Sequence, residues 1–300
     1  MRVGIPDALF IKEKLVMYKY FFEELGIEVV TSTPTTRKTI ESGNLFATSE
    51  DCIASKIFLG HVYELVNTKN LDYIILPRIF KYKNNREACV KAFAMYDICK
   101  NLFDFDFIDI NIDYSIKSSF LRALTRTGIN LGFSMSKSFL SAINAIRAQK
   151  KYDEERYLKQ FDNIDFNKKN VLIIGTEYLV KDRYINKILI SNLETSDMVP
   201  IYACISREDY EYKNISKQVY FENSIKILKG IEEYLPVIDA CILITGFSCA
   251  TDSLVHEMIK EKLKDITYIE IVIDENTSDT GIITRLESFK DILDGSSYIC

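Results

Sequence analysis

The chain has 300 residues, enough for about two domains because a single hydrophobic core stops growing near about 250 residues. Its 38 Lys and Arg against 43 Asp and Glu give a net charge of -5, which excludes nucleic acid as the expected partner because phosphates are neutralised by a basic surface. Hydrophobic residues at 47% and charged residues at 27% are typical of a folded globular protein and exclude a largely disordered chain.

Strands and helices alternate through the first part of the chain. The first predicted strand begins at residue 2 with no signal-peptide pattern before it, and no apolar stretch is long enough to cross a bilayer, so we expect a cytoplasmic protein with no membrane partner. The alternation predicts a parallel sheet with helical crossovers, and continuous apolar runs fit strands buried on both faces. The predicted strands are Arg2–Ile5, Ile27–Thr31 and Tyr73–Leu76, the last ended by Pro77, and the predicted helices are Lys14–Leu25 and Cys52–Asn67.

The same alternation restarts at residue 171, after a segment with apolar residues at helical spacing. We therefore predict two doubly wound, Rossmann-like α/β lobes with open parallel sheets, at 1–115 and 166–300, joined by a helical connector at 116–165. Small-molecule sites of such lobes lie in clefts at the carboxyl ends of the strands. The predicted later strands are Val171–Ile174, Pro200–Cys204, Ala240–Thr245 and Tyr268–Ile273, and the predicted helices are Tyr184–Asn192, Ser224–Tyr234, Thr251–Leu263 and Gly281–Leu293.

Seven cysteines are present, an odd number, and none of them forms a Cys-x-x-Cys pair. We therefore expect reduced thiols rather than a disulfide framework, and no zinc site of the usual spacing. Four cysteines have positions that favour structural or incidental roles. These are Cys99 in a helical pattern, Cys204 and Cys241 in predicted strands, and Cys300 at the last position.

The other three cysteines, Cys52, Cys89 and Cys249, each come just before a predicted helix, and we expect all three at strand-to-helix junctions. Cys89 follows the polar loop Lys81–Glu87. The partial positive charge of a helix N-terminus stabilises a thiolate, and thiolates bind soft metals and iron–sulfur clusters. From the residues alone, a cluster, a single redox-active cysteine and ordinary core packing all remain open.

Motifs in the first lobe resemble those of the acyl-CoA dehydratase activase-related proteins. This family is similar to a subunit of the 2-hydroxyacyl-CoA dehydratases and to the benzoyl-CoA reductase and double-cubane cluster proteins. The run Gly4–Leu9 looks like the family's Gly-Ile-Pro-Arg-Ala-Leu, with Asp7 in place of the arginine. The positions Cys52, Lys56, Gly60 and His61 match the spacing of its Cys-x-Pro-x-Lys-x-x-x-Gly-His motif, with Ala54 in place of the proline.

The second lobe carries further motifs of that family. Ser248–Ser253 is similar to Cys-Gly-x-Asp-Ser, with Ala250 in place of the glycine, and Thr284–Phe289 resembles Thr-Arg-Leu-Glu-Ala-Phe. Gly175 and Tyr178 look like the ends of Gly-His-Pro-Tyr, in which Glu177 departs from the family pattern.

The resemblance implies one 4Fe-4S cluster per chain in the cleft between the lobes, held by the cysteines that match the family's ligands, with one iron left open or bound by another ligand. It implies a low-potential electron-transfer or dehydratase/reductase-like component that receives electrons from an ATP-dependent activase and acts on an acyl-CoA or another small molecule. The matching ligand positions are Cys52, Cys89 and Cys249, and the residues expected beside the cluster are Lys56, His61, Ser248, Asp252 and Ser253.

Several alternatives stay open at this stage. The protein could be a non-catalytic cluster-bearing scaffold or relay, or a structural or zinc-binding homologue without the cluster, and a homodimer is plausible. His61 fits either a hydrogen-bonded packing residue or a proton shuttle, and Asp252 and Ser253 fit either helix caps or groups near the open iron. No GxGxxG or GxxxxGK[ST] motif occurs, so we do not expect this chain to hydrolyse ATP or bind a dinucleotide.

Overall fold

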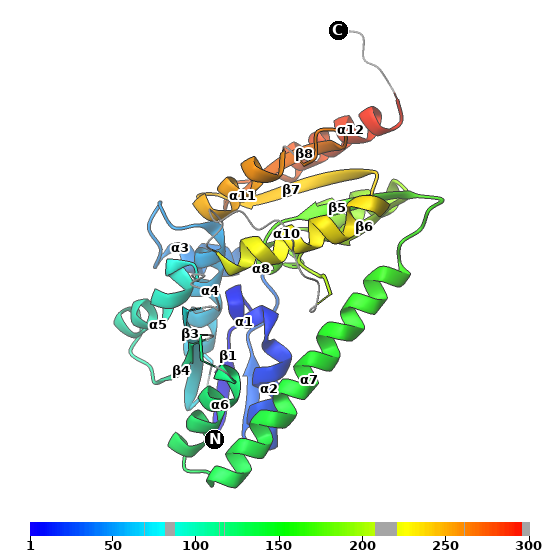
Figure 1. The fold of residues 1–300 in the computed structure, drawn as a ribbon. Helices are drawn as coiled ribbons and strands as arrows, with labels where there is room; N and C mark the ends of the chain where they lie inside the picture. Colours follow the sequence, from blue (N-terminus) through cyan, green and yellow to red (C-terminus); the bar gives the residue numbers. More distant parts are fainter. Residues whose placement is uncertain are drawn as a thin grey trace. The chain divides into compact units, whose positions relative to one another are not determined.

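The computed structural model describes residues 1–68, 70–81, 88–113, 115–116, 118–207, 221–260 and 262–295 (Figure 1). The chain divides into two compact units, which are described separately below. Unit 1 comprises residues 1–154 with 220–222, and unit 2 comprises 155–219 with 223–300. The division falls inside one continuous helix, and the helical connector at 116–165 stays a prediction.

Unit 1 is built on a parallel sheet in which four described strands follow the order β2-β1-β3-β4. The interior of the sheet is made of aliphatic side chains that are inaccessible to solvent, among them Ile5, Ile74 and Ile110. The strands are β1 (Arg2–Ile5), β2 (Glu28–Thr31), β3 (Tyr73–Lys81) and β4 (Phe107–Asp113), and the helices are α1 (Leu9–Glu13), α2 (Leu15–Glu24), α3 (Arg37–Asn44), α4 (Ile53–Val66), α5 (Val90–Leu102), α6 (Ser119–Asn130) and α7 (Met135–Asp162), whose second half belongs to unit 2.

The expected end of the third strand at Pro77 is wrong. β3 continues through Pro77, which is paired with Ile110 of β4. Proline has no N–H group and is therefore excluded from strands that are hydrogen-bonded along both edges. In the described residues β1 pairs with β3 only at Tyr73 and Ile74, so the later part of β3 is paired on its β4 side and accepts a residue without a donor.

Unit 2 repeats the arrangement with the strand order β6-β5-β7-β8, again parallel throughout the described residues. Aliphatic side chains of β5 and β7, such as Leu172 and Leu243, form its core together with Ile231 of α10. The strands are β5 (Lys169–Ile174), β6 (Met198–Tyr202), β7 (Ala240–Gly246) and β8 (Thr267–Ile273), and the helices are α8 (Glu177–Val180), α9 (Lys187–Thr195), α10 (Glu222–Tyr234), the 3-10 turn η2 (Leu235–Val237), α11 (Ala250–Lys260) and α12 (Asp279–Leu293).

Both units are therefore open α/β sheets of the doubly wound kind, as the sequence predicts. In each unit the first strand lies between the second and the third. The chain runs from the first strand toward one side of the sheet and from the third strand toward the other side. The loops that follow these two neighbouring strands therefore diverge at the carboxyl edge, which is where such sheets bind ligands. This edge lies after β1 and β3 in unit 1 and after β5 and β7 in unit 2.

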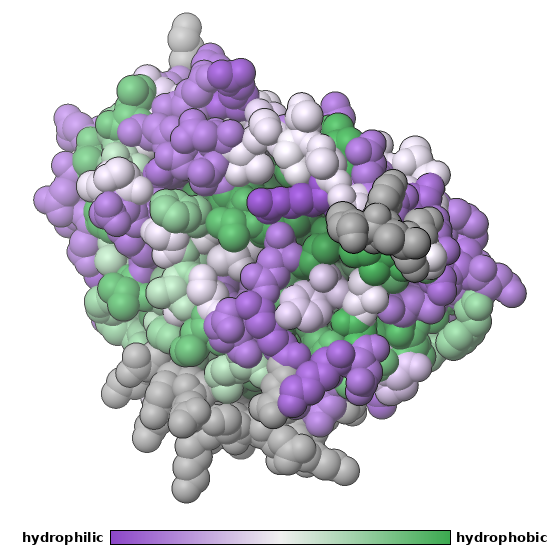
Figure 2. Space-filling model, turned by 90° about the horizontal axis from the view of Figure 1, so that it is seen from above, coloured by the Kyte–Doolittle hydropathy of each residue, from purple (hydrophilic) through white to green (hydrophobic). Residues whose placement is uncertain are grey.

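The surface mixes polar and apolar side chains without a continuous apolar belt on the face shown in Figure 2. Across the described ranges, none of the helices combines the length and the apolar character that crossing a bilayer requires.

Candidate functional site

Cys52 and Cys89 of unit 1 occupy equivalent positions at the starts of two helices. Cys52 is the N-cap residue of α4 and Cys89 is the N-cap residue of α5, and both residues are partly exposed. The Cys52 carbonyl accepts the N–H groups of Ser55 and Lys56, and its sulfur lies 3.3 Å from the Ser55 hydroxyl. Each of the two cysteines therefore lies at the positive end of a helix dipole.

The expected strand-to-helix junction is wrong for Cys52. The segment before it contains α3, so Cys52 lies between two helices. α3 begins with a reciprocal capping box between Thr36 and Thr39, which the sequence analysis did not identify. α4 nevertheless begins at the carboxyl edge of the sheet, because a crossover helix between parallel strands ends at the amino edge, where β3 starts.

An ion pair joins the starts of α4 and α5. The carboxylate of Asp51, which precedes Cys52, pairs with the ammonium group of Lys91, which lies two residues after Cys89. Thr48 donates to the same carboxylate from its backbone N–H at 2.8 Å and from its hydroxyl at 3.0 Å. Burial acts to raise the pKa of Asp51, but the bonds from Lys91 and Thr48 outweigh it and lower that pKa. The pair links the two segments that carry Cys52 and Cys89.

The motif residues after Cys52 are buried rather than open to a ligand. Lys56 is 3% exposed and His61 is fully buried. The Nε2 atom of His61 lies 3.0 Å from the hydroxyl of Thr35, the arrangement of a histidine that packs inside the protein. A side chain on Gly43 of α3 would place its Cβ 1.8 Å from the carbonyl oxygen of Lys56, so the two helices are in backbone contact here. The spacing of this motif therefore also serves helix packing.

Cys249 of unit 2 immediately precedes α11, after β7, as the sequence predicts for a strand-to-helix junction. Its backbone N–H donates to Gly246 at 2.7 Å, and its sulfur lies 3.1 Å from the Thr251 hydroxyl. The hydroxyl of Ser253 donates to the Cys249 carbonyl at 3.0 Å, a bond inside the first turn rather than a side-chain cap. Polar side chains thus surround a partly exposed thiol at the carboxyl edge of the second sheet.

Asp252 lies buried in the first turn of α11, only 4% exposed. Burial raises the pKa of its carboxyl group to about 6, while the nearby side chains of Cys249 and Thr176 act in the opposite direction. Thr176 follows β5 and Cys249 follows β7, so Asp252 lies near both of the loops that separate at the carboxyl edge of unit 2. This is the position in which the fold places ligand-binding groups.

The expected four-iron cluster stays a prediction. Within the described ranges, no three His, Cys, Asp or Glu side chains are grouped so that they could hold a metal ion. Cys52 and Cys89 belong to unit 1 and Cys249 to unit 2. Ser248 precedes Cys249, and its peptide bond with Phe247 is cis.

The other cysteines with described positions are buried. Burial raises the pKa of the thiols of Cys99, Cys204 and Cys241 to about 12, which keeps them protonated. This agrees with the structural roles expected for them. Cys300 and residues 82–87 of the polar loop Lys81–Glu87 lie outside the described residues.

His256 was missed by the sequence analysis. It is 4% exposed, and its Nδ1 atom lies 2.7 Å from the hydroxyl of Thr245 at the end of β7. Its Nε2 atom has no hydrogen-bond partner among the described residues. Burial lowers the pKa of the ring to about 4, so it is neutral at pH 7. The signal that would have found it is its spacing, one turn beyond Asp252 and two turns beyond Cys249 along α11.

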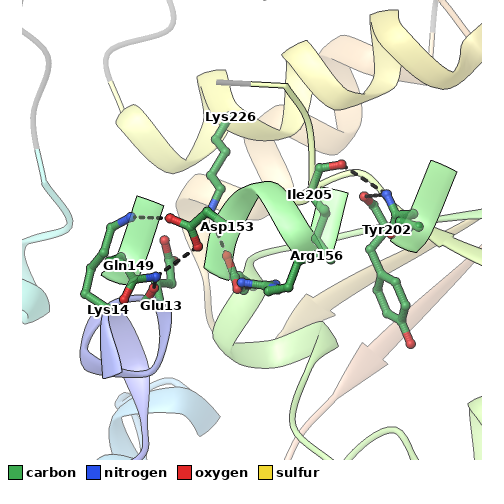
Figure 3. Close-up of polar contacts among 10 residues, drawn as sticks. Glu13, Lys14, Gln149, Asp153, Arg156, Tyr202, Ile205 and Lys226 are labelled. Carbon is green, nitrogen blue, oxygen red and sulfur yellow. Dashed lines mark hydrogen bonds and ion pairs between the residues drawn. The ribbon is translucent and has the colours of Figure 1, made fainter. Parts of the chain in front are cut away.

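A second polar cluster lies at the carboxyl edge between β5 and β6. The carboxylate of Glu177, which is 6% exposed, accepts Arg156 of α7 at 2.6 Å and Lys226 of α10 at 2.6 Å. Figure 3 shows Arg156 and Lys226 approaching from these two helices. Burial acts to raise the pKa of Glu177, but the two cations outweigh it and lower that pKa to about 2. The residue that departs from the family motif is therefore an ionised anchor for two helices.

The strand orders define a two-unit α/β protein, and partly exposed cysteines lie at the helix starts near the carboxyl edges of its two sheets. The chain belongs to the family described as the CoA enzyme activase uncharacterised domain (DUF2229), whose model matches residues 2–204. The matched part contains Cys52 and Cys89 and ends before Cys249. This supports an activase-related protein, whereas similarity to the dehydratase and benzoyl-CoA reductase subunits stays a prediction.

No curated protein matches this chain. Solved structures that align with it include the SBP FpvC of Pseudomonas aeruginosa in complex with Mn2+, at 10% identity over 99% of each chain and a TM-score of 0.30. The same protein in complex with Ni2+ aligns at 11% identity over 100% of this chain and 99% of that chain, with a TM-score of 0.27. A probable two-component system response regulator/GGDEF domain protein aligns at 10% identity over 98% and 99% of the chains, with a TM-score of 0.28. Likeness at this level carries no argument about function.

Proposed function

We propose that this protein carries one 4Fe-4S cluster on Cys52, Cys89 and Cys249, and works as a low-potential electron-transfer or dehydratase/reductase-like component of a CoA enzyme system. The observation that carries the proposal is the equivalent placement of Cys52 and Cys89. They are the N-cap residues of two helices whose starts are joined by the Asp51–Lys91 ion pair. The membership of the activase domain family supports the connection with CoA chemistry.

The donor set fits a cluster in its chemistry. Thiolates are the usual ligands of iron–sulfur clusters, and three of them leave one iron with an open position. The helix starts at Cys52 and Cys89 supply N–H groups and positive charge beside the sulfur atoms, which offset the negative charge of such a cofactor. The third ligand, Cys249, comes from unit 2, so the proposal requires both units.

Each part of the chain would then have a defined task. A cluster with one open iron supplies electron transfer and a position for a substrate oxygen. The Asp51–Lys91 pair would tie together the starts of the two helices that carry Cys52 and Cys89, and the Ser55 and Thr251 hydroxyls lie against the sulfur atoms of Cys52 and Cys249. Asp252 touches Cys249 with a carboxyl group that can hold a proton near neutral pH.

The partner in this proposal is a separate ATP-dependent activase that delivers low-potential electrons. This chain lacks both glycine-rich nucleotide motifs, so the ATP-hydrolysing step belongs to the partner. The substrate class is an acyl-CoA or a related small molecule.

A second candidate is a scaffold or relay that holds the cluster without turning over substrate. The burial of Lys56 and His61 favours this candidate, because it removes two polar side chains that could have served a substrate. A cluster-free protein that binds zinc, or whose cysteines are only structural, is the third candidate.

Anaerobic purification followed by iron, sulfide and zinc analysis and by EPR spectroscopy tests these candidates. We expect about four iron and four sulfide per chain and a cluster signal after reduction. Single Ala variants of Cys52, Cys89 and Cys249 should each lose most of the iron. The matched control is Cys99→Ala, which removes a buried thiol of α5 and should leave the iron content unchanged.

A colourless, iron-free protein would refute both cluster-bearing candidates, and stoichiometric zinc in its place would support the third. Adding reductant and candidate acyl-CoAs to the iron-loaded protein separates the first two. A relay would be reduced and reoxidised without product, whereas a dehydratase/reductase-like component would release one.

A further inference from the structure

Lys181 of unit 2 has an ammonium group that is fixed on an aromatic ring. It is the C-cap residue of α8, and its nitrogen lies 3.2 Å from the centre of the Tyr202 ring. The backbone N–H and carbonyl of Tyr202 are held by the side-chain amide of Gln160 from α7, at 3.0 Å and 3.1 Å. Because the face of an aromatic ring attracts a cation, a positive charge has a fixed position here.

Two further cations of unit 2 are fixed by a shared carboxylate. The buried Glu177 accepts Arg156 and Lys226 at 2.6 Å each (Figure 3). The side chains of Arg156 and Lys226 are 20% and 34% exposed, and Lys181 is also partly exposed, so solutes can reach all three. Side chains that are already fixed lose little conformational freedom when a ligand binds.

Positive charge exceeds negative charge in this cation cluster of Arg156, Lys181 and Lys226, although the chain as a whole has a net charge of -5. Glu177 offsets one of the three charges, and no carboxylate pairs with Lys181 among the described residues. Lys159 adds further positive charge at the Lys181 amine. Burial lowers the pKa of Lys181 to about 8, which leaves it mainly protonated at pH 7. Partly desolvated positive charge attracts an anion more strongly than charge on an open surface.

The cation cluster lies where a doubly wound sheet binds ligands. Lys181 follows β5, and the Tyr202 ring beneath it ends β6, so the cluster is at the carboxyl edge of unit 2. We propose that Arg156, Lys181 and Lys226 bind the phosphate or pyrophosphate group of a small molecule. The planar guanidinium and the compact ammonium group are both usual partners of phosphate oxygens.

The experiment is calorimetric titration of the full chain with inorganic pyrophosphate at pH 7 and low ionic strength. We expect saturable binding that weakens as salt is added. Lys181→Gln removes a positive charge and should weaken binding about ten-fold, whereas Lys181→Arg keeps the charge and should stay within about three-fold of the unsubstituted protein. The matched control is Lys187→Gln on the exposed face of α9, which should leave binding unchanged.

The absence of binding at millimolar pyrophosphate would overturn the proposal. Equal weakening by Lys181→Gln and Lys187→Gln would overturn it too, because it would show a general attraction of anions to the surface. Titrations with ADP and with coenzyme A, which both carry a pyrophosphate group, identify the source of the phosphate by the tighter of the two. None of these measurements requires a cluster, so they are independent of the proposed function.

Discussion

Gly60 of α4 lies against the backbone of Thr39 in α3, so closely that a Cβ on Gly60 would be 2.0 Å from the Thr39 carbonyl oxygen. The two helices therefore touch without an intervening side chain. The glycine of the motif that begins at Cys52 is required by this contact, whatever the cysteine binds. The helix that carries Cys52 is positioned by α3 through this contact.

We expect Gly60→Ala to destabilise unit 1 by about 1–3 kcal/mol or more, because an added methyl group has to push the two backbones apart. Urea unfolding of the cluster-free protein measures the change. The control is Lys38→Ala on the exposed face of α3, which should stay within about 0.5 kcal/mol of the unsubstituted protein. An unchanged midpoint for Gly60→Ala would show that α3 can move away from α4 at no cost.

Replacing Glu177 by Gln should destabilise unit 2 by about 3 kcal/mol, since Arg156 and Lys226 would lose the carboxylate they share. The lower part of the usual range applies because Lys226 is about one third exposed. The measurement is urea unfolding at pH 7.

The ionised carboxylate of Glu177 also makes the stability of unit 2 depend on pH. The folded-state pKa of about 2 lies below the unfolded value of 4.5, so the stabilisation is present above pH 4.5 and is lost as the pH falls toward 2. The difference between the protein and Glu177→Gln should therefore shrink between pH 5 and pH 3. A difference that does not change with pH would contradict the ionised state of Glu177.

His256 should make the protein less stable in mild acid. The unfolded histidine takes up a proton below about pH 6.5, whereas burial holds the folded pKa near 4, so stability falls as the pH drops between these values. His256→Gln removes this dependence, an effect on the order of 2–3 kcal/mol at pH 4 relative to pH 7. Urea unfolding at pH 7, 5 and 4 measures it, with Lys187→Gln as the surface control. Parallel curves for His256→Gln and the unsubstituted protein would contradict a buried neutral ring.

Iodoacetamide should distinguish two classes of thiol in the cluster-free protein. Partly exposed thiols at helix starts react within minutes, whereas buried thiols with a raised pKa react only after unfolding. Peptide mapping over time should show the fast class well ahead of the slow class, and loading with iron should protect the fast class. Early reaction of any buried thiol would show that its unit opens locally. The fast class is Cys52, Cys89 and Cys249, and the slow class is Cys99, Cys204 and Cys241.

The parts of the fold that the sequence predicts well are those with continuous apolar runs. β5 and β7 are predicted correctly as strands, because both of their faces are buried and their sequences are therefore continuous apolar runs. β4 was missed because apolar and polar residues alternate along it, and α3 was missed because it packs through Gly43 rather than through large apolar side chains. The strand end at Pro77 was misplaced because sequence alone does not show which edge of β3 is paired.

The candidate site was predictable only in part. The position of Cys89 and Cys249 before helices follows from local patterns of strand, loop and helix. The two ion pairs of Glu177 were not predictable, because Arg156 and Lys226 lie on two different helices and are separated by about seventy residues of sequence. Long-range charge pairing leaves no periodic signal in a single chain.

The helix α7 also restricts how the chain can be dissected. Its backbone hydrogen bonds run without a break through the boundary between the units at Glu154 and Glu155. A cut at that point would leave one fragment with unsatisfied carbonyl groups and the other with unsatisfied N–H groups, and both ends would fray. Fragments meant to be expressed separately should therefore end at residue 131 or begin at residue 163, so that one of them keeps the helix whole.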